Sequence, residues 1–352
     1  MDADRLPPAH GPHHEAVAVA PAAALGLDIG YSNLKTAAVV DARTATVRTR
    51  LRPAGAGPLA DLARGIDGRE APTVVEIDGV AWAAAVPHGA FETSERGTHA
   101  DYWQTDGYLA LARAGLEDAR SPLVRWLITG LPVAQAKEVE TRRALERRLG
   151  GVHGLGQDGM PRDVRVQEVR VVPQPLGAFV DAQTWFPDPA MLREGRVVVL
   201  DPGFFSVDWA VFEQTRFRAS SSGTSHFAMS VLLEQAAELV KAEAGIVVPP
   251  ERFETALRNG TASVLGEGQR LDAKPWLERA AAAVSQQVMT HLQRSFRGED
   301  TRPDVILLAG GGAEFYRPAV EALFPRAVVA IGAEPALANV RGFAMIAARA
   351  GG

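Results

Sequence analysis

The alternation of apolar and polar residues divides the chain into short strands and longer helices. Five apolar or alternating runs of strand length each stop at a glycine, a proline or a carboxylate, which is typical of strands in an α/β sheet. They cover residues 25–29, 123–131, 163–172, 197–201 and 305–309. Helical spacing follows at 103–119, 133–149 and 274–295. The pattern predicts an α/β protein.

The first of these strands leads into a hairpin tip with candidate chemistry. The strand reaches Asp28, the chain turns around Gly30, and an apolar run returns at 36–40. The polar residues of the tip are Ser32, Asn33 and Lys35. Backbone N–H groups at such a tip can cradle a phosphate while the carboxylate holds a hydrated cation.

The same order of residues returns about 170 positions later. A second apolar run ends at Asp201, Gly203 and Ser206 follow, and another strand returns. This repeat predicts two related domains that face each other. Asp208, on the returning strand, either supports the tip or makes a structural hydrogen bond.

A third element is the run of glycines at 310–312, between the last predicted strand and a helix. Glycines at this junction let a flat ligand or a phosphate approach the backbone closely. All three elements end strands of an α/β pattern, where ligands bind in such sheets. Two carboxylates and a lysine suit Mg²⁺ and a polyphosphate.

Other motifs are absent or lack the right context. Residues 154–159 match a dinucleotide-binding GxGxxG, but they follow a helix and precede Met160-Pro161, so we expect a flexible loop. No GxxxxGK[ST] sequence and no kinase catalytic loop occur. The arginines of 133–149 alternate with acids, which favours a solvated helix face over a nucleic-acid patch.

Composition narrows the class of protein. The chain has 352 residues, enough for two domains, and a net charge of −5, too mild for a nucleic-acid-binding body. It has no cysteine, which excludes disulfides and fits the cytoplasmic location we expect. No apolar span approaches the ~20 residues of a membrane helix. Residues 1–22 are expected to form a disordered leader.

Five motifs occur in order along the chain. They are Asp28-x-Gly30-(x)₄-Lys35, Pro173-Gln174-Pro175-x-Gly177-Ala178, Asp201-x-Gly203-x-x-Ser206-x-Asp208, Gly310-Gly-Gly312 and Asn339-x-Arg-Gly342. Together they resemble the phosphate-1, connect-1, phosphate-2, adenosine and connect-2 motifs of the actin/Hsp70/sugar-kinase ATPase superfamily, over about residues 24–350. Ile128-Thr-Gly-Leu-Pro132 and the Asp-Pro-Gly-aromatic tip are similar to ParM/StbA-type bacterial actin-like proteins, and most similar to the PRTRC system protein D branch.

The resemblance implies an actin-like (ribonuclease H-like) two-domain ATPase fold with a nucleotide cleft between duplicated domains. Domain I would comprise residues 23–180 and 335–352, and domain II residues 181–334. ATP and Mg²⁺ would be the ligands.

The resemblance also implies roles for single residues. Asp28 and Asp201 would position Mg²⁺, directly or through water, and Gln174 would orient the attacking water. The residues lining the phosphates would be Gly30, Ser32, Asn33, Lys35, Gly203 and Ser206. The residues bordering the adenosine would be Gly310, Gly311 and Gly312, with Glu314 nearby. Phe204-Phe205 departs from the small or polar pair of many relatives and predicts a tighter phosphate-2 tip.

The implied function is an actin-like ATPase that polymerises, for plasmid segregation or a related cytoskeletal role. Its partners would be further copies of itself and an adaptor that reaches plasmid DNA, because no DNA-reading motif is present. Two alternatives stay open. One is a small-molecule kinase, although no aspartate of 60–125 lies in a convincing sugar-binding pattern. The other is a nucleotide-gated interaction module that does not polymerise.

Overall fold

The computed structural model describes residues 24–41, 46–63, 72–92, 101–157, 160–297 and 302–351. The expected disordered leader, residues 1–22, lies outside this part of the chain. Within the described residues, no helix combines the length and the apolar character that crossing a membrane requires.

The first half of the chain builds a six-stranded sheet in the order β3-β2-β1-β7-β9-β8. Its strands are β1 (Ala24–Ile29), β2 (Asn33–Asp41), β3 (Thr46–Pro53), β7 (Leu123–Leu131), β8 (Gly151–Gln157) and β9 (Met160–Pro173). Helix α1 (Asp106–Leu116) packs on one face of β1 through Leu27, and α10 (Ala338–Gly351) packs on the other face against Gly26. β1 is therefore buried on both sides.

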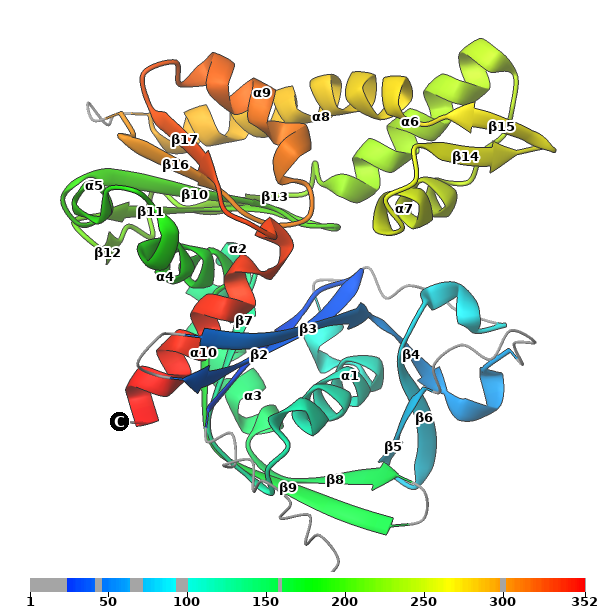
Figure 1. The fold of residues 1–352 in the computed structure, drawn as a ribbon, viewed down its shortest axis with the longest axis vertical. Helices are drawn as coiled ribbons and strands as arrows, with labels where there is room; N and C mark the ends of the chain where they lie inside the picture. The colour runs from blue at the N-terminus through cyan, green and yellow to red at the C-terminus, as the bar shows by residue number, and fades with distance from the viewer. Residues whose placement is uncertain are drawn as a thin grey trace, which may run out of the picture.

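The second half builds a sheet in the order β12-β11-β10-β16-β17, and Figure 1 shows it above the first. Its strands are β10 (Arg196–Pro202), β11 (Val207–Glu213), β12 (Arg216–Phe217), β13 (Gly223–Ser225, paired with β11), β16 (Val305–Leu308) and β17 (Val328–Ile331). One face packs against α6 (Met229–Ala244), α8 (Lys274–Ser295) and α9 (Ala313–Leu323). The other face packs against α4 (Gln174–Trp185) and α5 (Pro189–Glu194).

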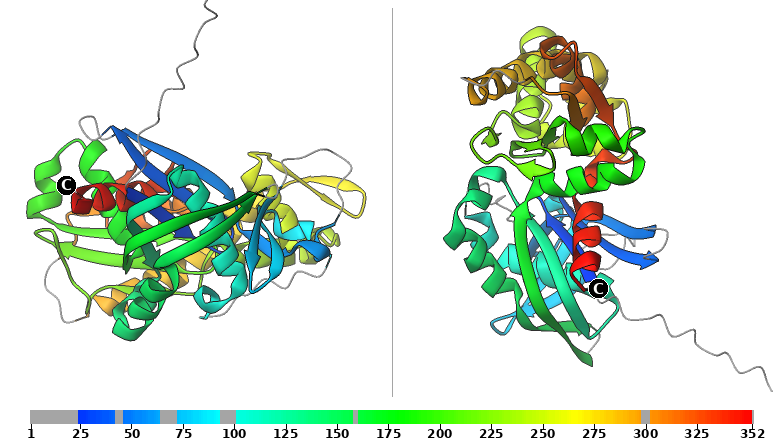
Figure 2. Two further views of the ribbon diagram at one scale, coloured as in Figure 1. Left: turned by 90° about the horizontal axis from the view of Figure 1, so that it is seen from below. Right: turned by 90° about the vertical axis from the view of Figure 1, so that its left-hand side faces the viewer.

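Smaller elements extend both halves. The first half carries β4 (Gly55–Pro58), β5 (Thr73–Ile77), β6 (Val80–Val86), α2 (Val133–Lys137), α3 (Val139–Leu149) and the short helices η1 (Leu59–Asp61), η2 (His88–Ala90), η3 (Tyr102–Gln104) and η4 (Glu117–Ala119). The second carries α7 (Pro250–Arg258), β14 (Ser263–Gly266), β15 (Gln269–Asp272) and η5 (Pro335–Leu337). The left view of Figure 2 shows α7, β14 and β15 at one end of the molecule, away from the C-terminus.

The predicted repeat is confirmed by the strand pairing. In each sheet the first hairpin strand lies between its antiparallel partner and a parallel strand, giving β2-β1-β7 and β11-β10-β16. The two-domain α/β fold is thus present. The expected domain boundaries stay predictions; one falls within α4, and the other lies immediately before η5.

Two local expectations were wrong. The helix expected at 133–149 is two helices, because Glu138 between them has an extended backbone. Residues 154–157 are not a loop but the end of strand β8, whose backbone groups pair with β9.

Helices α4 and α10 cross at the junction of the two domains. A Cβ on Gly177 would lie less than 3.0 Å from the Asn339 carbonyl, and one on Gly342 would lie as close to the Gly177 carbonyl. Arg341 of α10 donates two hydrogen bonds, of 2.8 and 2.9 Å, to the buried carboxylate of Asp181 on α4. The backbone contact is possible only because both residues at the crossing are glycines.

We expect Gly342→Ala to destabilise the protein. Alanine normally favours a helix interior by ~1 kcal/mol over glycine, but here its methyl group overlaps backbone of α4. The free energy of unfolding should fall by about 2 kcal/mol or more, measured by urea denaturation followed by circular dichroism. Gly107→Ala, whose Cβ would have no neighbour nearer than 3.8 Å, is the matched control and should unfold like the parent. Equal midpoints for all three proteins would contradict this packing argument.

Candidate functional site

A cleft of about 350 Å³ lies where the two hairpin tips meet. Its lining combines both tips, the glycines of 310–312, the start of α4, and one side of α7. Twelve of the thirteen residues predicted from the sequence line it: Asp28, Gly30, Ser32, Asn33, Lys35, Gln174, Asp201, Gly203, Ser206, Gly310, Gly311 and Gly312. Motifs that are far apart along the sequence therefore lie together in one cleft.

Both tips have the same turn geometry. The Gly30 N–H donates to the Asn33 carbonyl at 3.0 Å, and the Gly203 N–H donates to the Ser206 carbonyl at 2.8 Å. In the flanking strands, Asp28 is opposite Lys35, just as Asp201 is opposite Asp208. The two hairpins therefore differ mainly in whether a cation or an anion faces the aspartate.

Asp28 is held by two donors at the end of β1. Lys35 Nζ lies 2.8 Å from Asp28 Oδ2, and Gln174 Nε2 donates to Asp28 Oδ1 at 3.0 Å. Burial would lower the pKa of Lys35, but the Asp28 carboxylate, its hydrogen bond and Asp201 outweigh burial and leave the pKa raised. Lys35 therefore stays an ammonium group between two carboxylates.

Asp201 is the second buried carboxylate, and its charge is less well compensated. Burial raises its pKa to about 6, against the opposing effects of Lys35 and of Asn339, while Asp28 and Asp208 raise it further. Asn339 Nδ2, on α10, donates to Asp201 Oδ2 at 2.6 Å. Gly310 has a φ of +74° and leaves room for Asp201 Oδ1, which a Cβ there would strike.

Asp208 combines the two readings that the sequence left open, because it makes structural hydrogen bonds and also supports the tip. Its carboxylate accepts hydrogen bonds from Thr224 (2.6 Å), Ser206 (2.7 Å) and the Val133 N–H (2.6 Å). Burial raises the pKa of Asp208, and these donors oppose the shift. The residue joins the second hairpin to the first turn of α2 in the other domain, and it holds the Ser206 hydroxyl.

Two residues of α7 reach the first tip and were missed by sequence reasoning. Ser32 Oγ donates to Glu254 Oε1 at 2.6 Å across the cleft, and Arg258 donates to Ser32 Oγ at 3.3 Å. Arg258 also pairs with Glu254 at 2.7 Å, one helical turn apart. An i,i+4 Glu–Arg pair is ordinary on exposed helices, so it carried no signal for a site.

Aromatic side chains from both tips line part of the cleft. The Tyr31 ring lies 4.6 Å from that of Phe205 and 4.6 Å from that of Tyr102, measured between ring centres. Phe204 packs instead against the core of the second domain. The two aromatic residues that replace a small or polar pair thus have separate tasks, and Phe205 brings the two tips into direct contact.

The glycine turn offers open backbone to a ligand. No atom lies within 4 Å of the position of a Cβ on Gly311, whereas Gly312 N donates to the Pro202 carbonyl at 3.0 Å. Glu314, in the first turn of α9, is exposed and is not among the residues lining the cleft. Its assignment beside the adenosine stays a prediction without a contact to the cleft.

The donor set fits a magnesium–nucleotide complex better than a metal held by protein alone. The described residues contain no group of three His, Asp or Glu side chains that could hold a metal ion. Mg²⁺ needs six oxygen ligands and keeps several waters, so two carboxylates suffice when phosphates complete the shell. Asn33 Oδ1 is buried in the first tip without a hydrogen-bond partner. That oxygen could accept a hydrogen bond from a water held in the tip.

Two family models match the chain. Residues 26–177 match the model described as actin like proteins N terminal domain, and residues 199–322 match that of the archaeal actin homologue MreB-like, C-terminal. Neither model is specific to the PRTRC system protein D branch, so that placement stays a prediction. No curated protein matches the sequence.

Solved structures with the same fold cover nearly the whole chain. An archaeal actin homologue in complex with ADP is 17% identical, with 92% of this chain and 99% of that chain covered and a TM-score of 0.72. A ParM of Clostridium botulinum, solved as a 15-stranded filament, is 15% identical, with 92% and 98% covered and a TM-score of 0.71. A ParM of Bacillus thuringiensis with ATP is 13% identical, with 93% and 98% covered and a TM-score of 0.60. The chain belongs to the actin-like family and has the two-domain fold of its ParM-type members.

Proposed function

We propose that the protein binds Mg²⁺-ATP in the cleft between its two domains, hydrolyses it, and assembles into filaments. The observation that carries the proposal is the meeting of two carboxylate-bearing hairpin tips, one half-buried lysine and an open glycine turn in a single cleft. The ADP of the archaeal homologue and the filament of the Clostridium botulinum ParM support it.

Each group of residues has a task in this proposal. Asp28 and Asp201 hold Mg²⁺ through their carboxylates or through water, and the ion supplies positive charge to the phosphate oxygens. Lys35 and the backbone N–H groups of both tips neutralise and position the phosphates. Phosphoryl transfer depends mostly on positioning and charge, so no strong base is required.

Gln174 is the residue we assign to the attacking water. Its amide nitrogen donates to Asp28, which fixes the side chain at the start of α4, and its body packs over Gly130. The amide oxygen is then the group that accepts a hydrogen bond from water. Because Gln174 is hydrogen-bonded to Asp28, the carboxylate that we assign to Mg²⁺ also sets how far Gln174 lies from the first phosphate-binding tip.

The Gln174→Ala protein should bind ADP within about twofold of the parent but hydrolyse ATP at least about tenfold more slowly, because a positioning residue contributes mainly in the transition state. Phosphate release and calorimetric binding measure the two quantities separately. Gln183→Ala, on the same helix without a hydrogen bond to the cleft, is the control and should leave both unchanged. Undiminished turnover in Gln174→Ala would show that another residue handles the water.

Binding of Mg²⁺-ADP should weaken as the pH falls through about 6, the raised pKa of Asp201. Above this pH the carboxylate is charged and can hold the metal; below it the neutral acid cannot, and affinity falls by up to about tenfold per pH unit. Calorimetry at pH 7.5 and pH 5 measures the effect. The Asp201→Asn protein reports the titration of the nucleotide phosphates alone, so its pH dependence should be shallower. Parallel curves for the two proteins would exclude Asp201 as the titrating group.

Filament assembly should depend on the nucleotide. With Mg²⁺-ATP the protein should scatter light, pellet on ultracentrifugation and show filaments by electron microscopy, and with ADP it should return to solution as domain closure relaxes. If it hydrolyses ATP yet stays unpelletable in both states, the nucleotide-gated module without polymerisation is the correct reading.

A further inference from the structure

A second cavity, of about 310 Å³, lies in the first domain on the far side of β2 from Lys35. We call it the arginine pocket. It is lined by Arg48 and Arg50 of β3, by Asp118 of η4, by Arg120, and by apolar residues of β1 and β2. Its lining carries three guanidinium groups and one carboxylate, a formal net charge of +2. None of these residues lines the nucleotide cleft.

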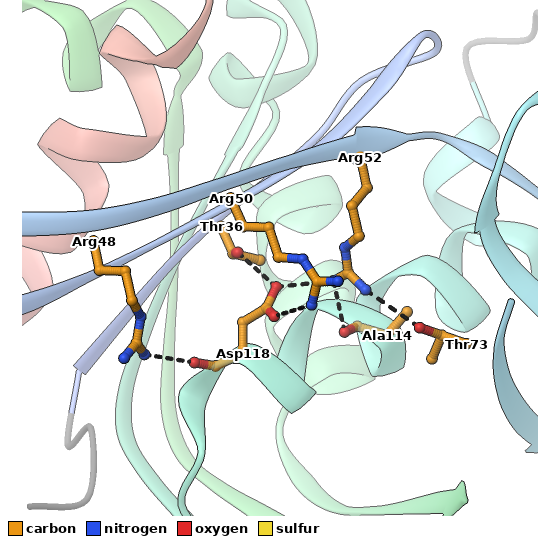
Figure 3. A network of polar contacts seen from close by, with 7 residues as sticks. All are labelled: Thr36, Arg48, Arg50, Arg52, Thr73, Ala114 and Asp118. Carbon is orange, nitrogen blue, oxygen red and sulfur yellow. Dashed lines mark hydrogen bonds and ion pairs between the residues drawn. The ribbon is translucent and has the colours of Figure 1, made fainter. Parts of the chain in front are cut away.

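The carboxylate at the floor of the pocket is already satisfied. Asp118 accepts hydrogen bonds from Thr36 at 2.7 Å, from Arg50 at 2.9 Å and from Arg52 at 2.9 Å (Figure 3). Arg52 lies behind the pocket, is buried, and also donates to the Ala114 carbonyl. Asp118 therefore needs no further cation, because Arg50 and Arg52 both form ion pairs with its carboxylate.

Two guanidinium groups at the rim have no carboxylate partner among the described residues. Arg48 donates only to the backbone carbonyl of Asp118, at 2.9 Å. Arg120 is exposed, and its side chain makes no hydrogen bond or ion pair within the described chain. It also has a φ of +52°, a conformation that glycine or asparagine adopts with less strain. The pocket thus presents unused donors with the fork geometry that carboxylates and phosphates match.

The strand that carries these arginines is at the edge of its sheet. β3 pairs with β2 on one side, and no strand of the described residues pairs with its other side. Arg48 and Arg50 are two positions apart, so their Cα atoms are separated by about 7 Å along the strand. Carboxylates at alternate positions of a second extended strand have the same spacing. A free strand edge is also where extended peptides bind through their backbone.

We propose that the arginine pocket and the free edge of β3 together bind an extended acidic peptide segment of a partner protein. Its backbone pairs with β3, and its carboxylates bind Arg48, Arg50 and Arg120. Nucleic acid fits less well, because the chain carries a net charge of −5 and an aspartate forms the floor of the pocket. This partner site lies wholly within the first domain.

The test uses the full chain and a fluorescein-labelled peptide of alternating glutamate and threonine, about eight residues long, with anisotropy as the readout. The parent should bind it, and Arg48→Glu/Arg120→Glu should weaken binding at least about tenfold through lost and reversed charge. The control Arg143→Glu/Arg147→Glu makes the same change of net charge on exposed positions of α3 and should bind like the parent. An equal loss in both variants would overturn the proposal, since only overall charge would then matter.

One further variant and one further peptide test the guanidinium contact and the strand pairing separately. Arg120→Gly removes one guanidinium while suiting the left-handed backbone, so it should fold as stably as the parent and still bind the peptide more weakly. A peptide with proline in place of threonine keeps every carboxylate but loses those N–H donors, and it should bind at least several-fold more weakly. Equal binding of the proline peptide would overturn strand addition. Displacement of the peptide by a single-stranded oligonucleotide that binds more tightly would show a nucleic-acid site instead.

Discussion

Two aspartates buried in one cleft set the electrostatic problem around which this protein is organised. Each loses most of its hydration, and each raises the free energy of the other as long as both are charged. Lys35 lies in the field of both and is the only ammonium group among the described residues that line the cleft. Removing one partner of such a buried group leaves uncompensated charge, which typically costs about 3–5 kcal/mol. A bound divalent cation would relieve the same repulsion, so the two carboxylates favour the ligand that we propose for this cleft.

The two copies of the hairpin form the two halves of the cleft, but they carry different side chains at equivalent positions. Position seven after the aspartate is Lys35 in the first hairpin and Asp208 in the second. The lysine neutralises its own aspartate and remains in the cleft. The aspartate instead binds the start of α2, so the second hairpin is fastened to the opposite domain. Charge compensation and domain docking are thus divided between copies of the same turn.

The hairpin tips and the glycine turn could be predicted because all their determinants lie within a few residues. Apolar strand, carboxylate, glycine and returning strand are local signals, and each sits at the end of a strand. Glu254 could not be predicted in the same way, because it is 222 positions from its partner Ser32 and meets it only through the packing of the folded chain. Asn339 belongs to a predicted motif, yet its bond to Asp201 depends on the crossing of α4 and α10. The break between α2 and α3 at Glu138 was missed for a similar reason, because the helical spacing of apolar residues in the sequence continues across it.

The arginine pocket was equally invisible in the sequence, because β3 and η4 are far apart along the chain and share no local pattern. β2 connects this pocket to the cleft. Its consecutive residues Lys35 and Thr36 point to opposite faces of the sheet, one to Asp28 and the other to Asp118. A strand with a carboxylate partner on each of its two faces has little freedom to shift in register, because a one-residue slip would exchange both sets of partners. The same constraint that positions Lys35 beside Asp28 therefore holds Asp118 and the arginine pocket in place.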